Sequence, residues 1–472
     1  MSSFHGTCVI RRHSVHRCWI RCLCTASAAR EQATTYMASR ADSLVPAIKK
    51  SLRAWSRTPE HLCLFSISKN MPQSVMTELV SSITQTQQTH VGTLSEPLHP
   101  GTLSQHASSM QGPLYSVALA WMPASQAIAF RSVIPGAPRI AVGRWPEQKE
   151  TWHADPTARM KHLDEAGHWA PLWGRQNVER RIPVELEAVA QNPSDIHAFL
   201  LFSDAFPQGL LEGLDSHFPH TSLLGTVAAY TPFETGREHT LFYGTGTQGV
   251  YEKGAVGIAF RSSARLERTL GGLVPVGPRL AITGAQGNII SSLDHHNATQ
   301  QLIRLITGQQ RARGVALQDP QAVRAMASHV RKDDDVFLGM YAHQEDDMPL
   351  TIARIQSGHP MRGTLCIDAD IELGGPQKYA QVYRSSDERS VADPFLPASI
   401  RYIVASGNEA ATALQKANTH LTRMDNDLVS LEHTFLVASD KGWFGRASTS
   451  FSSPTHTYAI PHTSASLAHS LT

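Results

Sequence analysis

The sequence predicts a two-lobed protein that combines α/β with α+β architecture, built from mixed β-sheets with flanking helices. Three observations lead to this fold class. A strand-helix-strand pattern occurs twice in the first half, a glycine-spaced strand pattern follows it, and short strands with few helices fill the second half. At 472 residues the chain is long enough to bury large cores.

The first strand-helix-strand pattern covers residues 61–93. An apolar run over 61–66 is followed by apolar residues at helical spacing, and then by a second β-rich run that ends in Gly92 and Thr93. A helix that connects two strands in this way joins parallel strands, because the chain must cross back over the sheet.

The same order returns in residues 197–226. This copy contains a second Leu-Phe-Ser landmark at 201–203 and ends its last strand in Gly225 and Thr226. We therefore predict a duplicated strand-helix-strand unit in the N-terminal lobe, with both copies adjacent in one sheet. The alternative is that the resemblance between the copies arose by chance.

The remaining elements are predicted in chain order from alternation and helical spacing. Residues 146–193 break the β pattern, and we interpret them as an insertion that either decorates the fold or covers a site. Strands are expected near 115–121, 127–131, 140–144, 336–341, 351–356, 364–368 and 379–383, and helices near 298–306 and 323–330.

Several glycine-containing motifs occur in a characteristic order. They are Phe202-Ser203-Asp204, Gly213-Leu214, Gly225-Thr226-Val227-Ala228, Gly254 to Phe260, Gly272 to Pro278, Gly287-Asn288 and Arg362-Gly363-Thr364. With this set the chain resembles the FIST domain family, named for F-box and intracellular signal transduction. The resemblance implies a FIST N-terminal domain at 37–270 and a FIST C-terminal domain at 271–450. The Ser/Thr/His-rich composition of residues 451–472 predicts a disordered tail. No F-box is evident.

The resemblance also implies a function. It suggests a sensory or signalling protein that binds a small polar molecule, with amino acids as the suggested class. The alternative is a protein-interaction scaffold related to F-box ubiquitin-ligase substrate receptors, because some eukaryotic relatives combine an F-box with FIST domains. A protein partner would then replace the small molecule.

A ligand site is predicted where the strands of the two copies end. Glycine allows close backbone approach, hydroxyl groups supply neutral hydrogen bonds, and a single carboxylate, Asp204, would hold an ammonium group. The alternative is that the glycines only permit tight packing. The predicted ligand-binding residues are Ser66, Gly92, Thr93, Ser203, Asp204, Gly225 and Thr226.

Residues 1–36 have a different composition. The first acidic residue is Glu31, whereas Arg11, Arg12, Arg17 and Arg21 precede it. An arginine-rich, acid-poor amphipathic leader is typical of a mitochondrial presequence, with cleavage expected between residues 25 and 37. The alternatives are a basic tail on a cytoplasmic protein and a true start at Met37.

Composition argues against several other functions. A formal charge of +2 favours no nucleic-acid partner, and no apolar run is long enough for a membrane helix. The G-x-G-x-x-G match at 244–249 precedes a strand-like run, so a hairpin is expected instead of a nucleotide site. Histidine pairs lack ligand spacing, so neither metal nor cofactor is expected. We expect no enzyme, with a hydrolase assembled from distant residues as the less favoured alternative.

Overall fold

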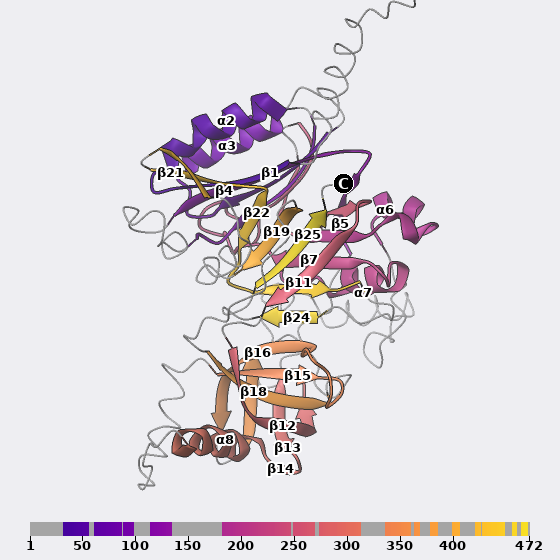
Figure 1. Cartoon of the computed structure of the whole chain (residues 1–472), viewed down its shortest axis with the longest axis vertical. Coiled ribbons are helices and arrows are strands. Elements are labelled where there is room, and N and C mark those ends of the chain that lie inside the picture. Colours follow the sequence, from indigo (N-terminus) through magenta and orange to yellow (C-terminus); the bar gives the residue numbers. More distant parts are fainter. Residues whose placement is uncertain are drawn as a thin grey trace, which may run out of the picture.

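The computed structural model shows two lobes, with the larger one at the top of Figure 1 and a smaller one below it. In the larger lobe, helices lie on the outside of two layers of strands, and a further small sheet lies between these layers. The structure describes residues 32–55, 61–86, 88–98, 114–134, 182–246, 249–269, 273–312, 336–359, 363–368, 378–385, 399–405, 421–425, 427–448, 456–459 and 464–470.

A first repeat forms one half of the large lobe. It consists of β1 (Gln32–Ala38), η1 (Ala41–Ser43), α2 (Leu44–Trp55), β2 (His61–Ser68), α3 (Gln73–Thr84), β3 (Thr89–Ser95) and β4 (Tyr115–Pro123). The strands lie in the order β1-β4-β2-β3, and only the β2–β3 pair is parallel. Helices α2 and α3 bury their apolar sides against one face of these strands, around Phe65.

A second repeat has the same topology. It consists of β5 (Ala127–Ser132), α6 (Val184–Ala190), η3 (Pro193–Asp195), β6 (Ala198–Ser203), α7 (Gln208–His217), β7 (Ser222–Val227) and β10 (Ala255–Phe260). Its strand order is β5-β10-β6-β7, and again only the last pair is parallel. The predicted duplication is therefore confirmed, and it extends beyond one strand-helix-strand unit to the whole repeat.

The prediction that both copies share one sheet is wrong. Strands β2 and β3 belong to a first sheet, whereas β6 and β7 belong to a second sheet. The two sheets bury a common core that includes Leu64, Val91, Leu200 and Leu224. Each repeat has helices on one face only, so its other apolar face must be covered by a second layer. The facing repeat supplies one part of that layer, and a small central sheet supplies the rest.

The Leu-Phe-Ser landmarks of the two copies are offset by one residue. Gly92 lies opposite Phe65 in the β2–β3 pair, whereas Gly225 lies opposite Leu201 in the β6–β7 pair. If the glycines are aligned, Ser66 corresponds to Phe202 and not to Ser203. A one-residue shift moves a side chain to the other face of a sheet, so the two serines point to different layers.

Further strands extend the first sheet at both edges. They are β8 (Leu241–Thr245) and β9 (Val250–Tyr251) beyond β3, and β21 (Leu428–Glu432) and β20 (Leu421–Asp425) beyond β1. Strands β8 and β9 are antiparallel neighbours. The G-x-G-x-x-G segment thus connects a hairpin as predicted, and no helix follows it that could bind a pyrophosphate.

A central four-stranded sheet lies between the two repeats. Its strands, in spatial order, are β11 (Ala264–Thr269), β25 (Ser464–Ser470), β19 (Ser399–Ala405) and β22 (Thr434–Ala438). The ring centroids of Tyr402 and Phe260 are 5.3 Å apart, which joins this sheet to the second repeat. On the other side, the Thr35 hydroxyl donates to the Thr434 carbonyl at 2.8 Å, which joins it to β1.

The small lobe is a closed barrel with one helix. Its elements are β12 (Leu273–Gln286), β13 (Ile289–Leu293), β14 (His296–Asn297), α8 (Ala298–Ala312), β15 (Val336–Tyr341), β16 (Thr351–His359), β17 (Thr364–Asp368) and β18 (Tyr379–Ser385). Pairing runs β12-β18-β15-β16-β17-β13 and back to β12, and α8 packs on its core. The strands predicted in this lobe are confirmed.

The C-terminal part of the chain returns to the large lobe. Strand β23 (Trp443–Arg446) pairs with β7, and β24 (His456–Ala459) connects β23 to β16 of the barrel. This differs from the predicted C-terminal domain at 271–450, because residues 399–446 complete the sheets of the N-terminal lobe. It also differs from the predicted disordered tail at 451–472, since β24 and β25 lie there.

Two other predicted boundaries differ from the structure. Strand β1 begins at Gln32, so the N-terminal domain starts before residue 37. Helix α6 and η3 lie within the predicted insertion at 146–193, yet α6 belongs to the second repeat as the counterpart of α2. The strand predicted near 140–144 and the helix predicted near 323–330 lie outside the described residues.

Candidate functional site

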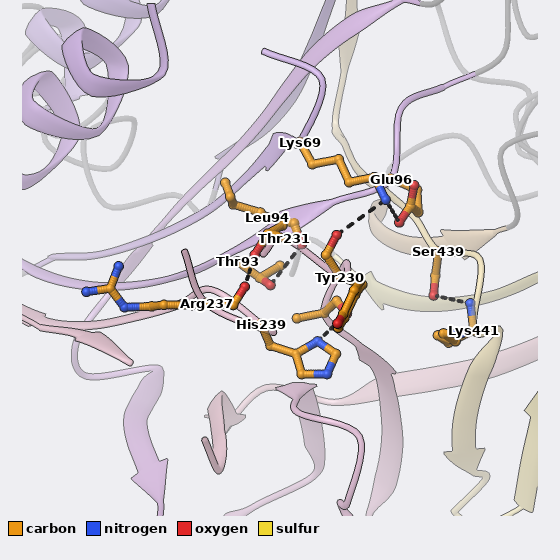
Figure 2. Close-up of polar contacts among 11 residues, drawn as sticks. Lys69, Thr93, Leu94, Glu96, Tyr230, Thr231, Arg237, His239, Ser439 and Lys441 are labelled. Carbon is orange, nitrogen blue, oxygen red and sulfur yellow. Dashed lines mark hydrogen bonds and ion pairs between the residues drawn. The ribbon is translucent and has the colours of Figure 1, made fainter. Parts of the chain in front are cut away.

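Strand ends from all three sheets of the large lobe meet at one place. Lys69 follows β2, Glu96 follows β3, the loop 228–240 follows β7, and Asp440 follows β22. Backbone bonds join these ends: the Ala229 amide donates to the Leu94 carbonyl, and the Glu96 amide donates to the Ala438 carbonyl, both at 3.0 Å. Figure 2 shows the polar side chains that gather here. We call Lys69, Glu96, Tyr230, Glu234 and Asp440 the strand-end cluster.

An ion pair forms the centre of the strand-end cluster. The Lys69 Nζ lies 2.7 Å from the Glu96 Oε1, and it also donates to the Tyr230 carbonyl at 3.4 Å. The side chains of Lys69 and Glu96 retain 25% and 14% of their exposure. Both charges are therefore largely desolvated, which makes their mutual contact stronger than that of a surface pair.

Acidic groups outnumber the cation at this place. Burial raises the pKa of Glu96, and the nearby charges of Asp440 and Glu234 raise it further, whereas the hydrogen bond and the charge of Lys69 lower it. The Glu234 Oε2 is buried and has no hydrogen-bond partner among the described residues. The cluster therefore has carboxylate oxygens available for an additional cationic donor.

The second repeat lacks this ion pair. With Gly92 aligned to Gly225, the counterparts of Lys69 and Glu96 are Ala205 and Ala229. The repeat folds with the same strand order although two alanines stand at these positions. A strand-helix-strand unit of this kind does not need an ion pair at its strand ends, which favours a functional role for the pair.

A network of threonine hydroxyls holds the base of the loop 228–240. The hydroxyl of Thr240 lies 2.8 Å from that of Thr231 and 2.7 Å from that of Thr235. The Nδ1 of His239 lies 2.9 Å from the Ala228 carbonyl, also within the loop. The base of the loop is thus held by short-range hydrogen bonds that sequence spacing did not predict.

Aromatic side chains are exposed on the same loop. Tyr230 is 48% exposed and packs edge-on against the buried His239, with ring centroids 6.1 Å apart. Phe233 is 95% exposed. An apolar ring that remains in water gains nothing from folding, so Phe233 is available for contact with a bound molecule or a partner.

The stability of the protein as a function of pH tests the surroundings of Glu96. The folded pKa lies above the ordinary value of 4.5, so the native state binds this proton more tightly than the unfolded chain does. This stabilisation is fully present below the unfolded pKa and is lost as the pH rises through the folded pKa. We expect the stability of Glu96→Gln, relative to wild type, to increase across that window, as measured by urea unfolding from about pH 4 to pH 8. A difference that does not change with pH would contradict this environment.

The structure distributes the predicted site residues over two faces. Ser66, Thr93 and Thr226 share the face of Leu64, Val91 and Leu224, which lies between the two sheets. Gly92, Gly225 and Ser203 lie on the opposite faces, which the helices cover. The predicted residues are near the strand-end cluster in the chain, but they do not line one common surface.

Individual contacts show what several of these residues do. The Asp204 carboxylate accepts bonds from the Gly254 amide at 2.6 Å and from the Phe206 amide at 2.9 Å, so it holds two turns. The Thr226 hydroxyl donates to the Gly442 carbonyl at 2.8 Å. The hydroxyls of Ser66 and Ser203 are buried without a partner among the described residues. Neither hydroxyl forms a hydrogen bond with a histidine of the described residues.

The two glycines at the strand ends allow close packing of aromatic rings. A Cβ atom on Gly92 would lie 2.6 Å from the Phe65 ring, and one on Gly225 would lie 2.1 Å from the Phe444 ring. Both distances are shorter than any normal contact. Packing against helix-facing rings is thus sufficient to account for glycine at these positions.

Other motifs do not assemble a metal or redox site. Asp294 and His295 both have positive φ and form the turn between β13 and β14. Among the residues that the structure describes, no group of three or more His, Cys, Asp or Glu side chains is arranged to hold a metal ion. Burial raises the pKa of the Cys63 thiol, and Cys63 and Cys366 are not joined in a disulfide. No helix in the described part of the chain is long and apolar enough to cross a membrane.

A duplicated α/β sandwich with an ionic cluster at its strand ends is the architecture of a binding module, because strand ends gather ligand contacts in such folds. Residues 116–296 match the family model of the FIST N domain, from β4 through the second repeat to β14. Residues 116–296 are therefore recognised as a FIST N domain, and this domain indicates a sensory role in signal transduction. No curated protein matches the sequence.

Proposed function

We propose that this FIST protein is a sensory module that binds a small polar molecule with an ammonium group, in the manner of an amino acid, at the strand-end cluster. The partly buried ion pair between Lys69 and Glu96 carries this proposal. It offers one charge of each sign at a place where three sheets meet and where the second repeat has only alanines.

The chemistry of the strand-end cluster suits a zwitterion. The ammonium group of the ligand would bind the carboxylates of Glu96 and Glu234, and its carboxylate would bind the Lys69 ammonium. The ligand thus replaces one desolvated ion pair by two. Lys69 contacts the backbone of Tyr230, and the exposed Phe233 lies on the same loop. Ligand binding at Lys69 would therefore change the position of this exposed aromatic surface. That surface is where we place the signal output.

A thermal-shift panel of amino acids, amines, nucleotides and divalent metals tests this function. A ligand at a hundredfold excess over its dissociation constant stabilises the native state by about 2.7 kcal/mol. We expect amino acids to stabilise the wild type, and we expect Glu96→Gln and Lys69→Met to weaken binding by roughly tenfold or more, because each loses a charged hydrogen bond.

Two control variants separate the strand-end cluster from other charged residues of the protein. Lys49 and Glu78 form a pair at 2.6 Å whose side chains are 40% and 49% exposed, so Glu78→Gln should leave ligand binding unchanged. Asp204→Ala removes the acid that the sequence pattern suggests for the ammonium group, and it should lower stability without abolishing the shift. A shift confined to nucleotides, or one that Glu96→Gln does not reduce, contradicts the proposal.

A protein-interaction role is the second candidate. The 95% exposure of Phe233 favours it, since an aromatic ring in a loop of the sensory domain is a suitable anchor for a partner. If no compound in the panel stabilises the protein, this candidate is preferred. A relation to ubiquitin-ligase substrate receptors would require an adaptor protein.

We also propose that residues 1–36 contain a mitochondrial presequence, supported by their arginine-rich composition. The position of β1 limits the cleavage site. The strand begins at Gln32 and lies between β21 and β4, so cleavage would have to precede it. N-terminal sequencing of the protein from its native source would show whether the mature chain begins between residues 25 and 31.

A further inference from the structure

A second polar cluster lies between the two sheets at their edges. Strand β5 is the edge of the second sheet and β9 is the edge of the first sheet, and α6 packs beside β5 (Figure 1). Arg131 comes from β5, Glu185 from α6, Tyr243 from β8 and Tyr251 from β9. We call these four residues the edge cluster. None of them belongs to the strand-end cluster.

Three side chains of the edge cluster, those of Arg131, Tyr243 and Tyr251, point into the space between the sheets, and Glu185 reaches Tyr243 from α6. Arg131 lies on the same face of β5 as Ala129, which belongs to the shared core, and both tyrosines pack against that core. The guanidinium carbon of Arg131 lies 3.6 Å from the centre of the Tyr251 ring. This stacking holds the cation against an aromatic face while leaving its edge free for planar hydrogen bonds.

The acid and the cation of the edge cluster are held apart. The Tyr243 hydroxyl donates to the Glu185 Oε1 at 2.8 Å, and the Arg131 backbone amide approaches the same oxygen at 3.4 Å. Burial and the charge of Glu185 raise the pKa of Tyr243, so its phenol remains a donor. No ion pair joins the Arg131 guanidinium to the Glu185 carboxylate, although both belong to the described residues.

Each of the two charged groups has an unpartnered buried atom. The Arg131 Nε and the Glu185 Oε2 are both buried without a hydrogen-bond partner among the described residues. A buried charged group that lacks a hydrogen bond destabilises the folded state, so buried polar atoms without a partner are rare in proteins and require an explanation. The Arg131 Nε requires a hydrogen-bond acceptor, and the Glu185 Oε2 requires a hydrogen-bond donor.

Aliphatic side chains are exposed next to these charges in the chain. Val133 is 68% exposed and lies two residues after Arg131, and Val184 is 72% exposed and immediately precedes Glu185. Large exposed aliphatic residues beside a small number of convergent polar groups are typical of sites for small amphiphilic ligands.

We propose that the edge cluster binds a branched aliphatic acid that has a hydrogen-bond donor on its α-carbon. The carboxylate of the ligand accepts from the Arg131 guanidinium, the α-donor is accepted by the Glu185 Oε2, and the aliphatic body contacts Val133 and Val184. Both a 2-amino acid and a 2-hydroxy acid have this chemistry. This site is independent of the one that we propose for the strand-end cluster.

Isothermal titration calorimetry on the full chain tests the edge cluster with three probes of similar size: leucine, 2-hydroxyisocaproate and isocaproate. We expect the first two to bind. Isocaproate lacks the α-donor, and we expect it to bind roughly tenfold to a hundredfold more weakly, which corresponds to one charged hydrogen bond. Equal affinity for all three acids, or no binding of any, overturns the proposal.

Variants at the edge cluster decide which groups are used. Arg131→Met should abolish binding of 2-hydroxyisocaproate and isocaproate, neither of which has the ammonium group that the strand-end cluster would bind. Glu185→Gln preserves the shape of the side chain. It should weaken the binding of leucine more than the binding of 2-hydroxyisocaproate, because it removes the negative charge that pairs with an ammonium group. If Arg131→Met does not fold, the isosteric variant Glu185→Gln still tests whether the edge cluster binds the ligand. Unchanged binding of leucine in this variant contradicts the site.

The strand-end cluster serves as the control for this experiment. Glu96→Gln should leave the binding of 2-hydroxyisocaproate unchanged, because that residue lies outside the edge cluster. If leucine binding survives Arg131→Met and Glu185→Gln but is lost in Glu96→Gln, the ligand sits at the strand ends. The edge proposal then fails while the proposed sensory function stands.

Discussion

A chain that begins at Met37 is expected not to fold. Such a chain lacks Gln32 to Tyr36, the greater part of β1, which pairs with β4 on one side and β21 on the other. Thr35 would also be lost, and its hydroxyl makes two bonds to β22, accepting from the Leu436 amide at 2.9 Å and donating to the Thr434 carbonyl. The first and central sheets would both be left with unpaired backbone groups in a buried position.

The expected loss in the free energy of unfolding is comparable with the total stability of an ordinary domain. Loss of three buried side chains, Ala33, Thr35 and Tyr36, and of two ladders of hydrogen bonds amounts to at least about 5 kcal/mol, against a typical total of about 5 to 15 kcal/mol. The measurement is soluble yield together with far-ultraviolet circular dichroism.

The matched control is a chain that begins with Met followed by residues 31–472. It retains all of β1 and should be soluble and cooperative in urea. If the chain that begins at Met37 is as stable as this control, then β1 does not contribute to the first sheet as described, and Met37 becomes an acceptable start.

Replacement of Arg446 by Met is expected to destabilise the protein by about 3 to 5 kcal/mol. The Arg446 side chain is 1% exposed on β23, and burial lowers its pKa although it remains charged. Its guanidinium donates to the carbonyls of Phe218 at 2.6 Å and Thr221 at 3.1 Å, and it pairs with Asp215 of α7. Methionine fills part of the space, but it leaves the Thr221 carbonyl without its guanidinium donor and the Asp215 carboxylate without this cation.

Urea unfolding measures the effect of Arg446→Met. Arg261 is the control, since its pair with Asp195 spans 3.8 Å and their side chains are 39% and 52% exposed. Arg261→Met should change the free energy of unfolding by less than about 1 kcal/mol. Arg446→Lys retains the charge but loses the planar set of guanidinium donors. Its loss in the free energy of unfolding should therefore lie between those of Arg261→Met and Arg446→Met. A loss below about 1 kcal/mol for Arg446→Met would falsify its role in joining β23 to α7.

Local patterns predicted the elements that bury one face. Strand β2, α3 and β3 follow from their apolar runs and helical spacing, as do β6, α7 and β7 and the barrel strands β15 to β18. Strand β19 and the strands after it were missed, although residues 399–405 are an alternating β-rich run. The sequence pattern contains no information about which sheet such a run joins.

The sequence also predicted a ligand site at the strand ends, and that site stays a prediction. Parallel strand ends gather polar groups, which pointed to the ends of β2, β3, β6 and β7. The residues chosen there came from the Leu-Phe-Ser and Gly-Thr landmarks, together with Asp204, but Lys69 and Glu96 lie only a few residues beyond those of the first copy. A signal was present, because a lysine and a glutamate follow two neighbouring parallel strands at the same level. The edge cluster left no signal, since its four residues come from four separate elements.

The sequence by itself determined the secondary structure of each repeat, the duplication and the FIST relationship, because periodicity and order of motifs are local properties of the chain. Tertiary structure alone decided three things: that the repeats face each other in two sheets, that the C-terminal strands return between them, and that Lys69 meets Glu96. Each of these depends on which apolar faces pack together. The hydrophobic effect is not directional, so the pairing of apolar faces is set by the packing of the whole chain and not by local sequence.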